Sequence, residues 1–399
     1  MYGPLIIEPQ DPEPFRYDRE HVVMLTDWTD EKPERVFAKL KKQSDYYNFH
    51  RRTVGDFFRD VGELGFGRTV ADRKTWGEMR MNPTDLADVS GYTYTYLMNG
   101  AAPAVNWTGV FRSGERIRLR LINGSAMTYF DVRIPGLKMT VVAMDGQYVH
   151  PVTVDEFRMA VAETVDVIVE PSGQDAFTIF AQSMDRTGYA RGTLATREGL
   201  GAPVPDLDPH ALLTMADMGH GGMGHDMAAM GGAPAGVSPV DAKAPSSGSP
   251  RPEDPHAGHT MAAPAPTTPD AHAGHNMPAR PPATPDPHAG HDMSAMGGSM
   301  QTHPASEEGN PLVDMQTMSP TSRLDDPGIG LRDNGRRVMW SDLEDNAGQF
   351  LVRKHTIDMP PGTKRSYRVT ADALGRWAYH CHLLFHMESG MFREVRVDE

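Results

Sequence analysis

The chain has 399 residues, enough for two or three domains, a formal net charge of −14 and a pI near 5.6. An acidic chain lacks the excess of Lys and Arg that a phosphate-binding surface needs, so we exclude a nucleic-acid partner. No run of about twenty apolar residues is present, which argues against an integral membrane protein, and the single cysteine excludes an internal disulfide framework.

The first residues, MYGPLIIEP, form a short apolar run that ends at Pro9. They predict one strand that has no partner among its sequence neighbours. The run lacks the basic region and the apolar core of a signal peptide. We therefore expect a cytoplasmic chain, a mature chain, or a chain whose front is missing.

A complete all-β domain is predicted over residues 21–202, with a partly helical insert at about 31–90 that includes a helix in 33–47. Apolar and polar residues alternate in short runs separated by Gly, Pro and Asn, which is typical of an antiparallel sandwich or barrel. The predicted strands are 93–100, 115–125, 128–134, 138–146, 163–171 and 176–183.

The composition changes at about residue 203, and residues 203–320 are rich in Pro, Ala, Gly, Ser, Met and His. This composition buries too little apolar area to offset chain entropy, so we predict a disordered linker. Within it, DPHAGHTM, DAHAGHNM and DPHAGHDM repeat at an interval of sixteen residues, starting at 254, 270 and 286. A simple tether does not need His and Met at a fixed interval, so the repeats indicate a function beyond connecting the domains.

Strand patterns return near the C-terminus, at 348–359, 364–371, 375–383 and 391–397. A two-sheet sandwich takes about 100 residues, and fewer remain after the linker. The last domain, residues 321–399, is therefore predicted to be partial.

The sequence HCHLLFHMESGM, residues 380–391, brings together the single cysteine, three histidines and two methionines. In a strand, His380 and His382 share one face and Cys381 points to the other. Cys381, His386 and Met391 offer a thiolate, an imidazole and a thioether, three of the four ligands of a blue-copper electron-transfer site. His380 and His382 suit a second copper site. A single buried Cys is usually inert and a His-x-His is often incidental, but the combined spacing favours copper.

These residues resemble the last copper motif of multicopper oxidases, and together with the Met/His repeats they are similar to the bacterial copper resistance protein A group. The resemblance implies cupredoxin-like Greek-key domains, with residues 1–20 left over from a first domain and 21–202 forming the second. It implies type 1 copper at Cys381, His386 and Met391, with Cys381 as electron entry and relay. His380 and His382 would each bind one copper of a type 3 pair where O2 is reduced.

The chain departs from that pattern. A complete enzyme uses several His-x-His pairs, whereas this chain has one, and the motif expected before Met339 is absent. The resemblance therefore indicates an N-terminal truncation and an internal deletion before Met339, and whether the chain is an enzyme stays open. Replacement ligands are not expected, because His355 lies in a predicted strand and is interpreted as structural, and His50 and His150 have no ligand-like neighbours.

The Met/His repeats predict copper binding that requires no fold, since thioethers favour Cu(I) and imidazoles bind either oxidation state. Two functions follow: a periplasmic copper resistance oxidase that oxidises Cu(I) or small phenolic substrates with O2, or a non-catalytic copper-sequestering protein. The periplasm is implied by the resemblance and by the metal-scavenging linker. The candidate linker ligands are His220, His225, Met227, His256, His259, Met261, His272, His275, Met277, His288, His291 and Met293.

Overall fold

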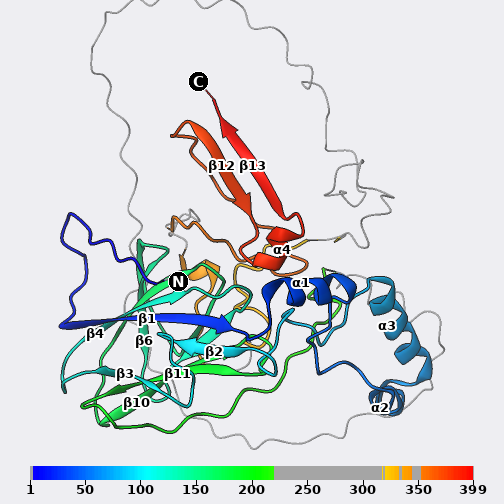
Figure 1. Ribbon diagram of the computed structural model, residues 1–399, viewed down its shortest axis with the longest axis horizontal. Helices are drawn as coiled ribbons and strands as arrows, with labels where there is room; N and C mark the ends of the chain where they lie inside the picture. The colour runs from blue at the N-terminus through cyan, green and yellow to red at the C-terminus, as the bar shows by residue number, and fades with distance from the viewer. Residues whose placement is uncertain (1–2, 220–316, 318–319, 332–334, 344–351, 399) are drawn as a thin grey trace, which may run out of the picture. The chain divides into compact units, whose positions relative to one another are not determined.

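A computed structural model describes residues 3–219, 317, 320–331, 335–343 and 352–398, and its largest part is a sandwich of two β-sheets (Figure 1). One sheet has the strand order β2-β1-β4-β9-β6-β7 and the other β3-β11-β10-β5-β8. The all-β sandwich predicted from the alternating pattern is confirmed. Its strands are β1 (Arg19–Trp28), β2 (Thr95–Met98), β3 (Trp107–Val110), β4 (Ile117–Asn123), β5 (Phe130–Arg133), β6 (Met139–Met144), β7 (Gln147–Val154), β8 (Glu156–Met159), β9 (Thr164–Val169), β10 (Ala176–Ser183) and β11 (Tyr189–Ala195).

Most neighbouring strands are antiparallel, and short turns connect several of them. The turn between β6 and β7 consists of Asp145 and Gly146, both with positive φ, at 48° and 73°. This is the Asp-Gly sequence that a two-residue hairpin turn favours, because the primed turn matches the twist of the strands. Two parallel pairs, β1 with β4 and β3 with β11, complete the two sheets.

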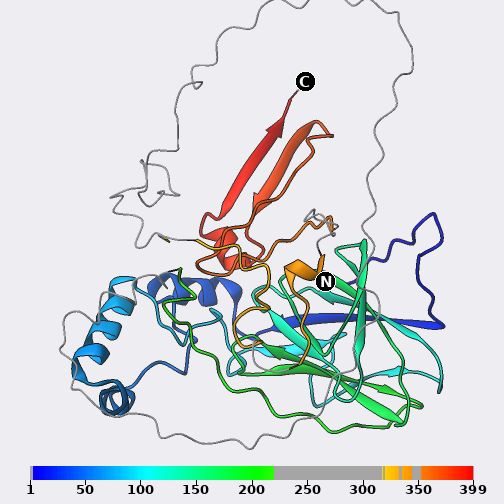
Figure 2. The ribbon, with the colours of Figure 1, turned by 180° about the vertical axis from the view of Figure 1, so that it is seen from behind.

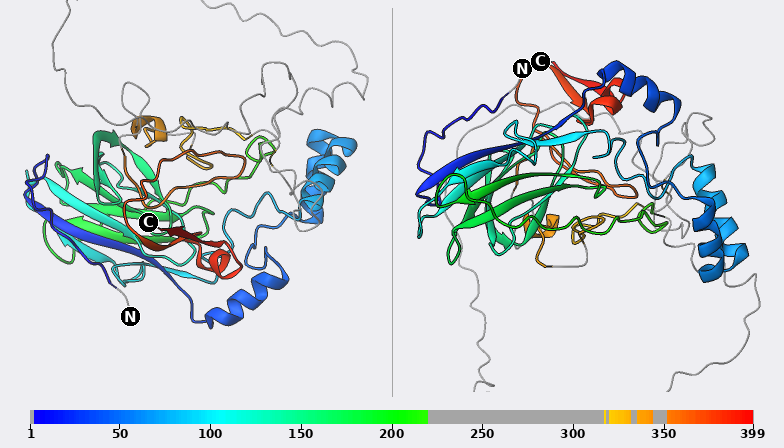
Figure 3. Two further views of the ribbon diagram at one scale, coloured as in Figure 1. Left: turned by 90° about the horizontal axis from the view of Figure 1, so that it is seen from above. Right: turned by 60° about the horizontal axis from the view of Figure 1, so that its bottom comes forward.

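The core lies between the two layers, which Figure 3 shows from two further directions. Side chains that alternate inward from both sheets fill it, in keeping with the period of two in the sequence. Phe130 and Phe177 from one sheet and Leu119 and Val167 from the other are fully or almost fully buried. The sandwich therefore has a complete core of its own.

The insert between β1 and β2 contains three helices, α1 (Pro33–Lys42), α2 (Val54–Leu64) and α3 (Phe66–Glu78), of which α1 lies within the helix predicted in 33–47. Pro33 stands at the start of α1, where its missing N–H costs nothing. Thr53 and Asp56 form a reciprocal capping box at the start of α2. α1 leads from the sandwich towards the C-terminal motif.

Two segments assigned by sequence to the linker or the last domain pack against the sandwich instead. In the segment 203–219, Leu213 and Met218 are buried. His210 binds the backbone oxygens of Asp185 and Thr84 through its two ring nitrogens, at 2.7 and 3.0 Å. Residues 203–219 are therefore part of the folded region and not of the predicted linker. Their low apolar content led to the linker prediction, but the buried Leu213 and Met218 and the hydrogen bonds of His210 hold them against the sandwich.

The second of these segments, residues 335–343, is held to the sandwich by a buried ion-pair network. Glu156 on β8 pairs with Arg337 at 2.7 Å and with Arg133 at 3.2 Å. Asp131 on β5 pairs with Arg158 at 2.8 Å and Arg186 at 2.6 Å. Each carboxylate is almost fully buried and faces two guanidinium groups, so its desolvation is compensated.

The C-terminal part consists of β12 (Gly375–His380), the short helix α4 (Leu384–Glu388) and β13 (Phe392–Val397). β12 and β13 form a two-stranded antiparallel sheet, which Figure 2 shows from behind. The strand predicted over 364–371 is wrong, and the described part of 348–359 also contains no strand. The structure likewise assigns no strand to residues 3–18. A strand requires a continuous ladder of hydrogen bonds to a neighbour, and in the described part of the chain these segments make only isolated backbone bonds, such as Asp18 N–H to Arg116 and Lys364 N–H to Thr321.

Candidate metal centre

Cys381 and His386 lie together at the end of β12 and on α4. The Cys381 Sγ atom is 3.8 Å from His386 Nδ1. Burial alone would raise the pKa of the Cys381 thiol, but hydrogen bonds from His386 and from the Leu383 backbone outweigh burial and lower this pKa. The thiolate is the form that binds metals, so the local structure favours the ligand state of Cys381.

Asp88, which the sequence analysis missed, orients the imidazole of His386. Its Oδ2 atom is 2.8 Å from His386 Nε2, so the nitrogen facing Cys381 is His386 Nδ1. The hydrogen bond to Asp88, and after it the bond to Cys381, raise the pKa of His386 to about 10. A carboxylate on the second nitrogen is the usual support of a metal-binding histidine. Asp88 lies in the insert and carries no local motif that could have identified it.

The insert and the sandwich also position α4. Phe37 of α1 stacks on Phe385 with ring centroids 5.7 Å apart and an interplanar angle of 14°. The N–H of Leu384 donates to the Ala126 oxygen at 3.0 Å, and the N–H of Phe385 donates to the Met127 sulfur at 3.4 Å. Residues distant in sequence therefore fix the helix that carries His386.

Met391 is joined to this site through its backbone. Its carbonyl accepts a hydrogen bond from the Cys381 N–H at 2.9 Å, and its N–H donates to the His386 carbonyl at 3.1 Å. The turn includes Gly390 with φ of 107°, a conformation that favours glycine. These bonds close the loop between Cys381 and Met391. Met391 itself is 57% exposed, so its thioether remains in contact with solvent.

His380 and His382 have neighbouring rings with centroids 4.7 Å apart. The His380 ring stacks on Phe392 at 5.6 Å, and its Nδ1 lies 3.0 Å from the Cys381 carbonyl oxygen. Burial and the neighbouring histidines His380 and His355 lower the pKa of His382. The neutral imidazole required for a metal ligand is therefore favoured at His382.

The remaining histidines differ in part from expectation. His355 lies in a bend and not in a strand, and its Nε2 is 3.8 Å from Asp145 Oδ1. His50 was expected to lack ligand-like neighbours, yet it stacks on His210 with centroids 4.5 Å apart. Both nitrogens of His210 face carbonyl oxygens, so this pair connects segments of the fold. His150 is exposed on β7.

Among the described residues, no group of three or more His, Cys, Asp or Glu is arranged to hold a metal ion. The Cys381 and His386 pair alone nevertheless fits copper, because it offers a thiolate and an imidazole 3.8 Å apart, two donors that copper sites use. The linker candidates from His220 to Met293 lie outside the described residues. Copper ligation at all these positions stays a prediction.

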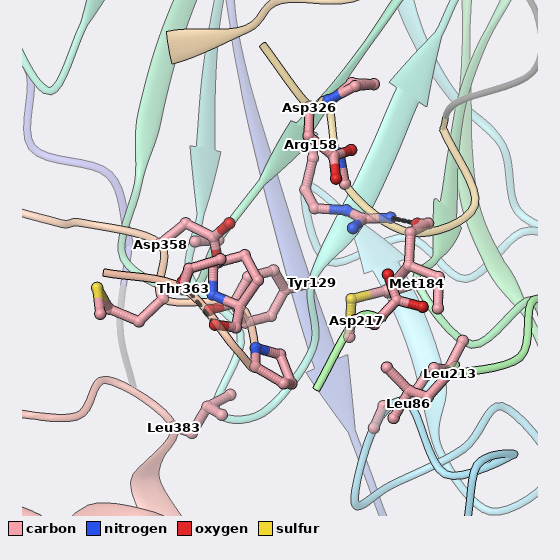
Figure 4. A pocket seen from close by; sticks show the side chains of 18 of the residues that line it. Leu86, Tyr129, Arg158, Met184, Leu213, Asp217, Asp326, Asp358, Thr363 and Leu383 are labelled. Atoms are coloured by element: carbon pink, nitrogen blue, oxygen red, sulfur yellow. Dashed lines mark hydrogen bonds between the residues drawn. The ribbon is translucent and has the colours of Figure 1, made fainter. Parts of the chain in front are cut away.

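A cavity of about 630 Å³ reaches this site, and His386 and Leu383 belong to its wall. Figure 4 shows Asp358, Tyr129 and Leu383 on one side of it and Met184, Leu213 and Leu86 on another. Carboxylates also line it, among them Asp85 and Asp88 of the insert. Six methionines share the lining: Met81, Met127, Met144, Met184, Met339 and Met359.

Profiles of the multicopper oxidase family match residues 19–199 and residues 332–399. The chain belongs to this family, whose cofactor is copper, and its sandwich is cupredoxin-like. It is 59% identical to copper resistance protein A of Escherichia coli and 58% identical to copper resistance protein A of Pseudomonas syringae pv. tomato. Each alignment covers 100% of this chain and 75% of the relative. The resemblance found in the C-terminal motif is thus confirmed.

The two alignments extend over 473 and 482 positions, more than the 399 residues of the chain. Each relative therefore carries residues without a counterpart inside this chain, in keeping with an internal deletion, whose place before Met339 stays a prediction. Among solved structures, the multicopper oxidase Fet3p, which functions in iron import, aligns with 50% of this chain and 32% of its own at 15% identity and a TM-score of 0.33. That likeness is too low to support an argument.

In the described parts of the chain, each helix is too short or too polar for a membrane crossing.

Proposed function

We propose that this chain acts in copper resistance as a periplasmic copper-binding oxidoreductase that takes electrons from Cu(I) or small phenolic substrates and delivers them to O2. The observation that carries the proposal is the 3.8 Å approach of Cys381 Sγ and His386 Nδ1, with Asp88 on the other nitrogen of His386. The names of the relatives, copper resistance protein A, support the same process.

The residues of the chain would divide the work as follows. Cys381 and His386 would hold type 1 copper, with Met391 as a weak third ligand, and bound copper would supply one-electron redox chemistry. Asp88 keeps the ring of His386 oriented through the bond at 2.8 Å. His380 and His382 are candidate ligands of a second copper site, since their rings are neighbours with centroids 4.7 Å apart, although strand β12 ends at His380 and does not include His382.

The cavity beside His386 supports Cu(I) as the substrate class. Thioether sulfurs are soft donors that select Cu(I), and six methionines line this space. Asp88, whose carboxylate bonds His386, stands at the same wall, and arginines such as Arg80 and Arg365 line it too, so the support for Cu(I) comes from the methionines. A phenol is the second possible substrate, because the wall also contains apolar side chains such as Phe157 and Trp340.

The second candidate function is copper sequestration without turnover. One His-x-His pair in the whole chain is too few for the several that a complete oxidase uses. No group of three or more His, Cys, Asp or Glu in the described parts is arranged to hold a metal ion. The Met/His repeats, in contrast, offer a histidine pair and a methionine three times over. Under this alternative the repeats would bind most of the copper.

The experiment that separates the two functions is an optical spectrum of the Cu(II)-loaded chain, with a copper count per chain and an oxygen-uptake assay on Cu(I) and on a diphenol. An intense thiolate-to-Cu(II) band together with oxygen uptake supports the oxidase. Several coppers per chain without the band and without uptake would leave sequestration. A band without uptake would show that type 1 copper binds but that oxygen reduction is lost.

A further inference from the structure

The hairpin of β12 and β13 is a two-stranded sheet that pairs with no other strand in the described part of the chain. Trp377, Tyr379 and Val395 are 51%, 57% and 49% exposed, and they share one face, because pairing places Trp377 opposite Val395 and Tyr379 opposite Arg393. An isolated two-stranded hairpin is at best marginally stable in water, and a third strand or packing against a helix is needed for independent stability. A partner strand along the hairpin edge would therefore stabilise it.

The backbone pattern shows which groups of β13 are available to that partner. The N–H of Cys381 bonds to the Met391 carbonyl, and in an antiparallel pair hydrogen-bonded and non-bonded positions alternate. The odd-numbered residues of β13, including Val395, therefore bond inward to β12. The N–H and C=O groups of Phe392, Glu394 and Arg396 point outward, along an edge open to another strand.

Charge along this edge favours a second copy of the same strand. If two β13 strands pair antiparallel about Val395, Glu394 of each copy stands opposite Arg396 of the other, and both are positions whose backbone groups point outward. Pairing about Glu394 or about Arg396 would oppose like charges, which destabilises a sheet. Pairing about Arg393 also places two arginines together. Among the registers centred on residues 393 to 396, only the one centred on Val395 places unlike charges opposite each other.

We propose that two copies of this chain associate through β13, paired antiparallel with Val395 on the two-fold axis, to form a four-stranded sheet. Glu394 already binds Arg376 of its own chain at 2.5 Å, so the partner adds a second cation to a carboxylate that is 41% exposed. On the other face the two Val395 side chains meet between two Trp377 rings. This contact is isologous, so it closes at two copies.

The first test is the dissociation constant of the metal-free full-length chain, measured by analytical ultracentrifugation for wild type and charge-reversal variants. Glu394→Arg and Arg396→Glu should each weaken the dimer by about tenfold or more, because each replaces two attractive cross-strand pairs by repulsive ones. The double variant should regain dimerisation. Arg396→Glu alone shows what the chain itself contributes, because its new glutamate already lies opposite Arg376 of the same hairpin; this single variant should still dimerise more weakly than the double variant.

The second test fixes the register by disulfide trapping in a Cys381→Ser background. Val395→Cys should cross-link two chains under mild oxidation, because opposite residues at a non-hydrogen-bonded position are about 4.5 Å apart between Cα atoms, within disulfide reach. Arg393→Cys is the matched control: its two copies would lie about four residues apart along the strands, roughly 13 Å. It should not cross-link.

A monomeric wild-type chain at tens of micromolar, a dimer indifferent to charge reversal, or equal cross-linking at both positions would each overturn the proposal. Circular dichroism of every variant shows whether the sandwich is folded. Because the chain is metal-free in these tests, their outcome is independent of the copper chemistry proposed above.

Discussion

Asp88 and His386 are 298 positions apart in sequence, yet their side chains are joined by a hydrogen bond of 2.8 Å. The contact connects the helical insert of the sandwich to the motif that carries Cys381. His386 faces the thiol with Nδ1 and the carboxylate with Nε2, so a single rotamer satisfies both neighbours. The metal centre is therefore shaped by the insert as well as by its own loop.

Replacing Asp88 tests this support directly. Asp88→Ala should weaken Cu(II) binding at Cys381 and His386 by about 10- to 100-fold, because a metal-binding histidine loses its orienting partner. Asp88→Asn should cost less, since the amide oxygen still accepts from His386 Nε2. The measurement is a Cu(II) titration followed through the thiolate-to-Cu(II) band, which the Met/His repeats do not contribute to. Equal affinities in all three proteins would contradict a positioning role.

Phe37 offers a second test of how the insert acts on the site. Phe37→Ala removes the stack on Phe385, worth about 1 kcal/mol beyond buried area, so we expect roughly fivefold weaker copper binding in the same titration. Phe37→Tyr keeps the ring and should restore wild-type affinity. A loss that Phe37→Tyr does not restore would assign the effect to folding of α1 instead.

Much of the sandwich is predictable from the sequence, because its strands alternate with a period of two and their partners are present. The residues 364–371 alternate equally well but form no strand, since local pattern says nothing about the presence of a neighbour. Cys381 and His386 were predictable as a pair from spacing alone. Asp88 and Phe37 were not, because only the folded insert brings them to α4.

Cys381→Ser tests how bound copper is divided between the Cys381 and His386 site and the Met/His repeats. We expect this variant to lose the thiolate band but to keep most of its bound copper, because the Met/His repeats at 254–293 are intact. The copper count per chain is measured by elemental analysis after removal of free metal. Alanine at the His and Met positions of the three repeats should give the reverse result. Loss of nearly all copper in Cys381→Ser would show that the repeats contribute little.

Lys354 joins the C-terminal segment to the sandwich through a buried ion triad. Its Nζ atom lies 2.5 Å from Glu163 Oε1 and 3.2 Å from Asp145 Oδ2, and all three side chains are at most 7% exposed. Lys354→Ala leaves two carboxylates buried without their cation, so we expect a loss of about 3–5 kcal/mol in the free energy of unfolding by urea. Lys74→Ala, which removes an exposed pair with Glu78, should cost less than about 1 kcal/mol. Similar losses in the two variants would argue against the triad.

Asp85 should make the stability of the fold depend on pH. Burial, with the carboxylates of Asp88, Asp45 and Asp185, raises the pKa of Asp85 to about 8. Between about pH 4 and pH 8 the folded state holds a proton that the unfolded state has released, so the free energy of unfolding falls as the pH rises. The stability that depends on protonated Asp85 is fully present below about pH 4 and fully lost above about pH 8.

Asp85→Asn cannot ionise, and its amide oxygen can still accept the hydrogen bond from the Ala87 N–H. Its stability relative to wild type should therefore improve from pH 5 to pH 9, by a few kcal/mol at most, at about 1.4 kcal/mol per pKa unit. The measurement is urea unfolding at pH 5, 7 and 9. Asp56→Asn is the control: hydrogen bonds from Thr53 lower the pKa of Asp56 to about 2, so its effect should stay constant over this range. A constant difference for Asp85→Asn as well would show that Asp85 is already ionised in the folded protein at pH 5.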